Sequence, residues 1–239
     1  MDDLISSARN PQAESLADSQ RRFIGLSSRA GTLGAMQVVR VALDRVARRF
    51  PGGPRGNRHL TALLGALLLV GILAEFGTLF LGLQRTLPWH IALGVALIPL
   101  VLLKLASTGW RMLRYYTRDP TYRAEGPPRP FLRGIAPVVV GSTLALLGSG
   151  VGLVVAGPHA HFFRAVHGAS FAIFLLVVGA HAIAHLSKVR RLAFADRVQG
   201  HALRRAAAGF ALVMGGAVAV AAAQSAGPWV AAMQHGFGG

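Results

Sequence analysis

The chain has 239 residues, of which 53% are hydrophobic and 14% are charged, and its formal net charge is +16. Soluble domains carry about 25% charged residues, so this composition argues against a soluble globular protein. The chain contains no cysteine, which excludes disulfides, thiolate-held iron–sulfur clusters, covalently attached c-type haem and a thiol nucleophile within it. Redox or metal chemistry would therefore rest on histidine, of which there are nine.

Residues 1–57 form a basic N-terminal segment whose first part is polar and expected to be disordered. Within it, residues 36–50 predict a short amphipathic helix that lies on a membrane surface. Val39, Leu43 and Val46 share one helical stripe there, while arginines project elsewhere. A weakly structured basic tail is the alternative for this stretch.

Five apolar segments follow, each long enough to cross a hydrocarbon core of about 30 Å at roughly 1.5 Å per residue. They cover residues 60–83, 87–108, 133–156, 164–187 and 206–226. The sequence therefore predicts an all-α integral membrane bundle. We expect a four-helix domain over residues 58–190, and a fifth transmembrane helix with a short outer tail over residues 191–239.

Basic residues alternate between the connections of these segments. The N-terminal segment up to residue 58 holds ten Lys and Arg, the 109–133 loop six and the 188–205 loop six, whereas each other connection holds at most one. By the positive-inside rule this predicts a protein of the cell's inner membrane with a cytoplasmic N-terminus and an outer C-terminus. The same distribution favours contact with membrane lipid and argues against binding to nucleic acid, which needs a single basic face.

Histidines recur at two depths of the predicted bundle. His90 near the outer end of the second segment and His167 near the outer end of the fourth lie at matching depth, as two axial ligands of one haem would. His181 and His185 follow His167 on the same helix face, about 21 and 27 Å deeper. His59, at the cytoplasmic edge of the first segment, can pair with either of them; we favour His181, with His185 as the alternative.

Two further ionisable residues lie in the apolar segments. Lys104, at the depth of His181, can bind a haem propionate or a quinone oxygen, or extend to the membrane interface. Glu75 is the only acidic residue in any apolar segment, and we favour a hydrogen bond to a neighbouring helix over a proton relay. Each histidine alone is equally compatible with an interfacial or interhelical contact, but their matched depths favour haem.

The positions of His59, His90, His167 and His181 resemble those of the bacterial di-haem cytochrome b superfamily, which includes the gamma subunits of formate dehydrogenases and nickel–iron hydrogenases. Residues 104–130, with KLASTG, RYY and GPP, also resemble actinobacterial cytochrome b-like membrane proteins. The resemblance covers about residues 58–190. It implies a four-helix bundle with two b haems, the outer one on His90 and His167 and the inner one on His59 and His181.

These observations predict a b-type cytochrome subunit that carries electrons between haem and a quinone or a soluble redox partner. Two haems b are expected, with one as the alternative. No soluble-enzyme motif is present, so an electron-transfer subunit is favoured over a stand-alone enzyme. The alternative from another class is a haem-free transporter or assembly subunit, in which Glu75, Lys104, His181 and His185 form an ion or proton path.

Overall fold

The computed structural model describes residues 37–47, 52–126, 130–193 and 199–235. The chain divides into two compact units, Met1–Arg49 and Phe50–Gly239. In the first unit, residues 37–47 form a helix, as predicted, and Val39 and Val46 remain exposed on it. The two ends of the expected 36–50 helix lie outside the described residues. Its contact with a membrane surface stays a prediction.

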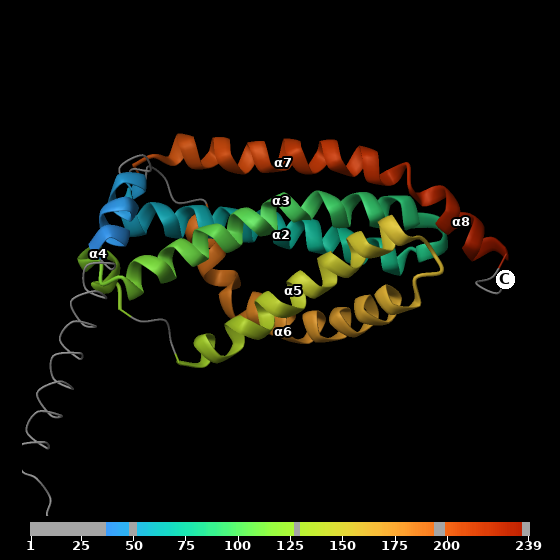
Figure 1. The fold of residues 1–239 in the computed structure, drawn as a ribbon, viewed down its shortest axis with the longest axis horizontal. Helices are drawn as coiled ribbons and strands as arrows, with labels where there is room; N and C mark the ends of the chain where they lie inside the picture. The colour runs from blue at the N-terminus through green and yellow to red at the C-terminus, as the bar shows by residue number, and fades with distance from the viewer. Residues whose placement is uncertain (1–36, 48–51, 127–129, 194–198, 236–239) are drawn as a thin grey trace, which may run out of the picture. The chain divides into compact units, whose positions relative to one another are not determined.

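The second unit is built from helices wherever the structure describes it (Figure 1). Five of these helices are long and apolar enough to cross a membrane, which confirms the predicted helical membrane bundle. In chain order the helices are α2 (Gly53–Phe80), α3 (Leu83–Tyr116), α4 (Pro120–Arg123), α5 (Pro130–Ala156), α6 (His161–Ala193), α7 (His201–Ala223) and α8 (Ala226–His235). The short helices α4 and α8 are the two that the apolar segments did not predict.

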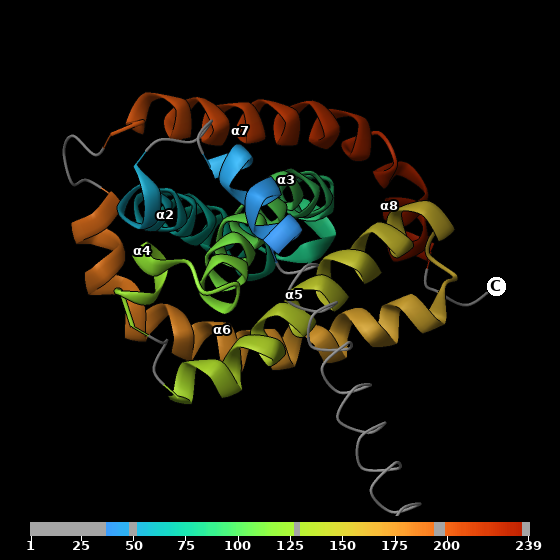
Figure 2. The same ribbon diagram turned by 60° about the vertical axis from the view of Figure 1, so that its left-hand side comes forward.

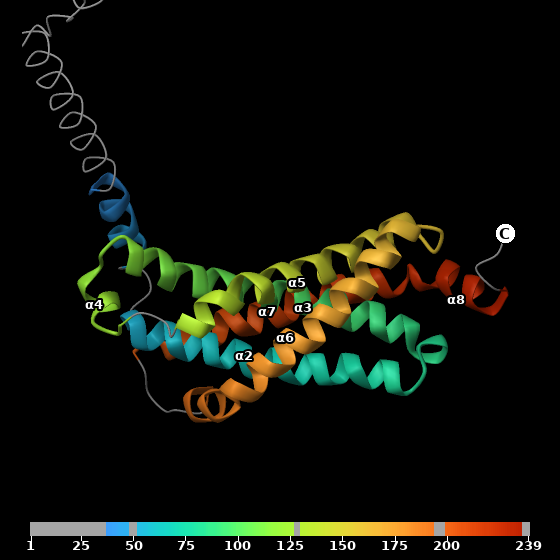
Figure 3. The same cartoon turned by 90° about the horizontal axis from the view of Figure 1, so that it is seen from below.

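Four of the long helices form a ring. α2 packs against α3 and α6, and α5 packs against the same two helices, so α3 and α6 stand at opposite corners. The fifth long helix, α7, packs on α3 and α2, on the side away from α5 and α6 (Figure 2). Figure 3 shows α6 crossing over α2. This is the predicted arrangement of a four-helix core with one additional helix.

The two ends of this bundle differ in their connections. At one end, called here the α8 end, α2 turns into α3 at Gly82 and α5 turns into α6 at Gly157. Both glycines have positive φ, +93° and +81°, a conformation that other residues rarely adopt. At the other end, called the α4 end, lie the start of α2, the end of α3 and helix α4 (Figure 1).

Large apolar side chains cover the outside of the helices. Val70 on α2, Leu176 on α6 and Val213 on α7 are 67%, 75% and 70% exposed. In water such a surface would promote aggregation, whereas in a bilayer it faces hydrocarbon. Together with the length of the five apolar helices, this exposure supports a multi-pass membrane protein that contacts lipid.

Several boundaries differ from the predicted segments, and α3, for example, ends at Tyr116 and not near residue 108. Helix α2 begins at Gly53 and not near residue 60, because Pro54 fits the first turn of a helix, where its missing N–H costs nothing. The residues expected to form a short tail after the last span include α8. There Trp229 is buried against Leu87 and Ile91, so α8 covers the α8 end of α3.

The close crossing of α7 and α3 yields a first prediction. A Cβ atom at Gly215 would lie 2.3 Å from the backbone oxygen of Ala96, so any side chain there forces the two helices apart. We expect Gly215→Leu to lower the free energy of unfolding by about 1–3 kcal/mol, as overpacking does. Thermal unfolding in detergent measures the effect. The matched control is Gly216→Leu, because a Cβ atom at Gly216 meets nothing within 4 Å. Equal losses in both variants would contradict the close contact.

Candidate functional site

His90 of α3 and His167 of α6 meet inside the four-helix ring. Their ring centroids lie 6.4 Å apart, and their planes are nearly perpendicular, at 84°. Because α3 and α6 stand at opposite corners, the two imidazoles bridge the inside of the bundle near the α8 end. The sequence predicted that these two residues share one depth, and the structure brings them together.

Two side chains of α2 lie against the Nδ1 atom of His90. Thr78 Oγ1 lies 3.0 Å and Glu75 Oε1 3.1 Å from this nitrogen. The Thr78 hydroxyl donates its proton to the Glu75 backbone oxygen, at 2.6 Å, so its oxygen can accept from His90. With two acceptors against Nδ1, the proton of a neutral His90 ring is assigned to Nδ1, which leaves the lone pair on Nε2.

His167 is held in the same way by α5. Its Nδ1 atom lies 3.1 Å from the Leu146 backbone oxygen, which can only accept, and 3.2 Å from Ser149 Oγ. The Ser149 hydroxyl donates to the Ala145 backbone oxygen at 2.6 Å, so it too is placed to accept. The proton of His167 is therefore assigned to Nδ1 as well. Both rings keep Nε2 as the nitrogen with a lone pair.

The predicted cofactor can be tested against this geometry. Two imidazoles on opposite sides of one metal ion have metal–nitrogen bonds of about 2 Å, which puts their ring centroids about 6 Å apart. The observed 6.4 Å matches this spacing. A ligating histidine also usually donates its other ring N–H to a carbonyl or carboxylate, and both Nδ1 atoms lie within hydrogen-bond distance of such an oxygen. The centroid distance and the Nδ1 contacts are therefore those expected if His90 and His167 together held one metal ion.

A cavity of about 280 Å³ lies between α3 and α5. Ile98 and Val101 line it from α3, and Leu147 and Gly148 line it from α5. Neither His90 nor His167 lines this cavity, so it is an apolar space separate from the pair.

The second pair of histidines lies toward the α4 end. His59 is 2% exposed. It lies six residues after the start of α2, whereas the sequence predicted a position at the edge of this helix. Counted from Glu75, His59 lies about 24 Å along α2, while His181 lies about 21 Å along α6 from His167. The depth of His59 lies midway between that of His181, at about 21 Å, and that of His185, at about 27 Å, so the choice between them stays a prediction. His181 is half-buried, and the side chain of His185 lies outside the described residues.

Lys104 joins a polar cluster near the same end. Its Nζ atom donates to the Thr61 backbone oxygen at 3.3 Å and so points to α2. Ser107 and Asn57, both buried, exchange two hydrogen bonds of 2.9 and 2.7 Å between α3 and α2. Thr61 Oγ1 lies 2.7 Å from Ser107 Oγ and extends this network. The predicted contact of Lys104 with a cofactor stays a prediction.

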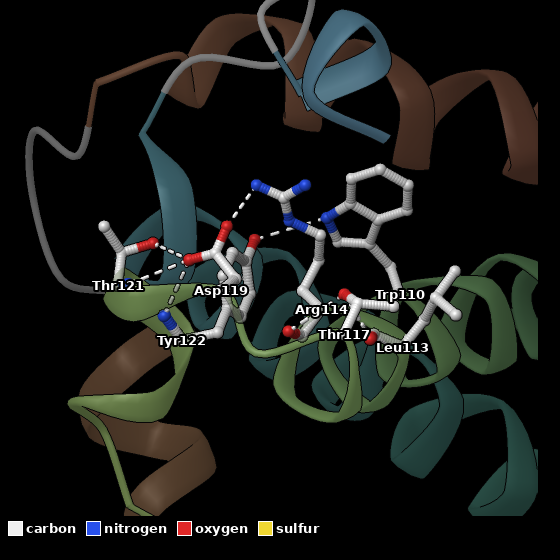
Figure 4. Close-up of polar contacts among 7 residues, drawn as sticks. All are labelled: Trp110, Leu113, Arg114, Thr117, Asp119, Thr121 and Tyr122. Carbon is white, nitrogen blue, oxygen red and sulfur yellow. Dashed lines mark hydrogen bonds and ion pairs between the residues drawn. The ribbon is translucent and has the colours of Figure 1, made fainter. Parts of the chain in front are cut away.

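A third cluster closes the loop between α3 and α4 (Figure 4). Arg114 and Asp119 form an ion pair in which each residue is nearly buried, at 6% and 7% exposure. The Arg114 guanidinium lies 5.8 and 5.9 Å from the ring centroids of Trp110 and Tyr122. Trp110 Nε1 also donates to Tyr122 Oη at 3.3 Å. This cluster fastens α4 to the end of α3.

The charge of Asp119 is maintained by its neighbours. Burial alone would raise its pKa, but hydrogen bonds from the Thr121 hydroxyl and the Tyr122 and Thr121 backbone N–H groups, with the Arg114 charge, hold the pKa below its usual value. Asp119 Oδ1 accepts from these two N–H groups at 2.8 and 3.1 Å, which caps α4. Burial also raises the pKa of Tyr122, which keeps its hydroxyl protonated.

Several residues of the His90–His167 site were not predicted. Thr78, Ser149 and the Leu146 carbonyl carry no signal by themselves, because hydroxyls and backbone carbonyls occur throughout these helices. The preferred interhelical hydrogen bond of Glu75 is present, and its partner is His90. No group of three or more His, Asp or Glu side chains that could hold a bare metal ion occurs among the described residues. The candidate site is therefore a two-histidine site.

Comparisons of the chain with protein-family models, curated proteins and solved structures find no match. The resemblance to di-haem cytochromes b accordingly stays an expectation based on the histidine positions. Any function must be argued from the geometry of this chain alone.

Proposed function

We propose that the protein is a b-type cytochrome subunit of the membrane that carries electrons between haem and a quinone or a soluble redox partner. The observation that carries this proposal is the His90–His167 pair, at 6.4 Å between centroids, with each Nδ1 atom anchored to an acceptor. A haem iron with two imidazole ligands supplies one-electron transfer and has no open position for oxygen.

The chain's own residues prepare this site before any cofactor enters. Thr78 and Glu75 orient the His90 ring, and Leu146 and Ser149 orient the His167 ring. Because each Nδ1 atom is bonded, each ring presents the Nε2 lone pair that a metal requires. Helices α2 and α5, which hold these acceptors, thus act as supports for ligands on α3 and α6.

The buried His59 and the half-buried His181 support a second haem toward the α4 end. His185 remains the alternative ligand, and a single haem remains the alternative stoichiometry. Lys104, which reaches α2 at this depth, is the proposed partner of a haem propionate or a quinone oxygen. By the positive-inside rule, the basic connections support a cytoplasmic position for this end in the inner membrane and an outer C-terminus.

A reduced-minus-oxidised visible spectrum of the detergent-purified protein tests the proposal. With pyridine haemochrome quantitation, we expect a b-type alpha band and about two haems per chain. One haem per chain would leave only the His90–His167 site. A folded protein that stays colourless after expression with haem available would overturn the proposal.

That outcome would favour the alternative, a haem-free transporter or assembly subunit. Its supporting observation is the contact of Glu75 with His90 inside the bundle, which a proton path could use. However, Lys104 lies about 21 Å from His90 along α3, and it hydrogen-bonds Thr61. We rank this function second because the two groups with printed contacts, Glu75 and Lys104, bond to different partners, His90 and the Thr61 backbone.

A further inference from the structure

Three arginines converge at the α4 end of the bundle. Arg55 and Arg58 lie three residues apart in the first turns of α2, and Arg111 lies near the end of α3. Hydrogen bonds between Asn57 and Ser107 hold the first turns of α2 beside the last turns of α3, so Arg58 and Arg111 lie at the same end of this helix pair. Like charges held this close repel one another, so their proximity needs a compensating anion or a rigid support.

The support is visible in the hydrogen bonds between the two helices. Asn57, the neighbour of Arg58, is bonded to Ser107, one turn before Arg111, through both its amide nitrogen and its amide oxygen, at 2.9 and 2.7 Å. Both residues are buried, so separating α2 from α3 would leave polar groups without partners. These bonds keep the arginines together.

The protein's own acids compensate only part of this charge. Glu125 forms an ion pair with Arg58, and Asp119 is engaged by the buried Arg114. In the part of the chain that the structure describes, no carboxylate forms an ion pair with Arg111. The pair of helices therefore retains excess positive charge where two candidate membrane spans end.

The last turns of α3 also carry exposed apolar side chains. Met112, Leu113 and Tyr116 are exposed within about one and a half turns of Arg111, on other sides of the helix. A ligand that matches this surface has an anionic head and apolar chains. Arginine forms paired hydrogen bonds with phosphate, and basic pockets between transmembrane helices bind anionic lipid head groups.

We propose that Arg55, Arg58 and Arg111 form a binding site for the phosphate of an anionic phospholipid whose acyl chains lie along the exposed apolar side chains of α3. This site is independent of the proposed haem function, because none of its residues contacts the His90–His167 pair in the described structure. The lipid supplies the negative charge that the protein lacks at this end.

Thermal unfolding of the purified protein with added phosphatidylglycerol or phosphatidylcholine tests the site. We expect phosphatidylglycerol to raise the unfolding temperature of the native chain more than phosphatidylcholine does, and added salt to weaken this effect. Arg111→Gln should raise the concentration of phosphatidylglycerol needed for the half-maximal shift roughly fivefold. Arg111→Lys keeps the charge but loses the paired hydrogen bonds with phosphate, so its effect should be smaller than that of Arg111→Gln.

The matched control is Arg85→Gln, an exposed arginine at the opposite end of the same helix, which should leave the response unchanged. Equal stabilisation by the two lipids would overturn the proposal, as would a response of Arg111→Gln equal to that of the native chain. If inorganic phosphate alone reproduces the stabilisation, the site binds a free anion, and the lipid assignment is wrong.

Discussion

Replacing His167 with alanine is expected to remove one haem from each chain, from two to one, or from one to none. The imidazole of His167 is one of two ligands across the bundle, 6.4 Å from that of His90, and no other described histidine forms a ring contact with His90. A haem left with one axial imidazole loses half of its protein ligation and is expected to dissociate during purification. Pyridine haemochrome quantitation per chain measures the change.

The matched control for this variant is His161→Ala. His161 begins the same helix, is exposed, and lies 3.0 Å from an Arg164 guanidinium nitrogen through its Nδ1 atom. We expect the control to keep the haem content of the native chain. Unchanged haem in His167→Ala would refute the ligand assignment. Equal loss in both variants would point to a fault in folding and not in ligation.

Within each hairpin, the position of the turn determines which residues face each other. Glu75 and His90 lie symmetrically about the turn at Gly82, as do Thr61 and Lys104. Two antiparallel helices joined by a tight turn bring together residues equally far from that turn. The partners of His90 and Lys104 could therefore have been predicted from numbering alone, once the turn was located.

The same rule applies to the second hairpin. Ser149 and His167, which are in contact, lie symmetrically about Pro158. The contact between His90 and His167 does not follow from this rule, because it depends on how the two hairpins pack face to face. Matched depth in the membrane supplied only part of that information. It gives the direction and depth of each helix, whereas the packing of the helices determines which of them stand opposite each other.

The count of basic loop residues included one arginine that the structure shows to be buried. Arg114 was counted among the loop residues that orient the protein by the positive-inside rule, and the structure shows it buried against Trp110 and Tyr122. A rule based on numbers of basic residues cannot distinguish a solvated arginine from a buried one. The burial arises from a helix, α4, too short and polar to be recognised as a segment. The sequence nevertheless indicates where α4 begins, because Asp119-Pro120 is a typical helix N-terminus.

The second large effect is expected at this cluster. Asp119→Ala should lower the free energy of unfolding by about 3–5 kcal/mol, because it leaves the buried Arg114 without its carboxylate and removes the cap of α4. For a domain of this size the unfolding temperature should fall by roughly 10 °C. Thermal unfolding in detergent at neutral pH measures the loss.

The control is Glu125→Ala, which breaks the nearby ion pair with Arg58. The side chains of that pair are 32% and 34% exposed, so solvent screens them and the loss should stay below about 1 kcal/mol. If both substitutions cost the same, burial does not decide the strength of the Arg114–Asp119 pair. The two ion pairs have the same types of charge and lie at the same end of the bundle. The difference between the two variants therefore measures the effect of burial.

The pH dependence of this variant separates the charge of Asp119 from its packing. The pKa of Asp119 in the folded chain is below its usual value, although burial opposes this, because its hydrogen bonds and the Arg114 charge favour the carboxylate. A lowered pKa stabilises the fold above the unfolded value of about 3.9, and this contribution is lost as pH falls through the folded pKa. The stability difference between the native chain and Asp119→Ala should thus be constant near neutrality and narrow below about pH 4. A difference that persists undiminished at pH 3 would show that Asp119 acts through packing and not through its charge.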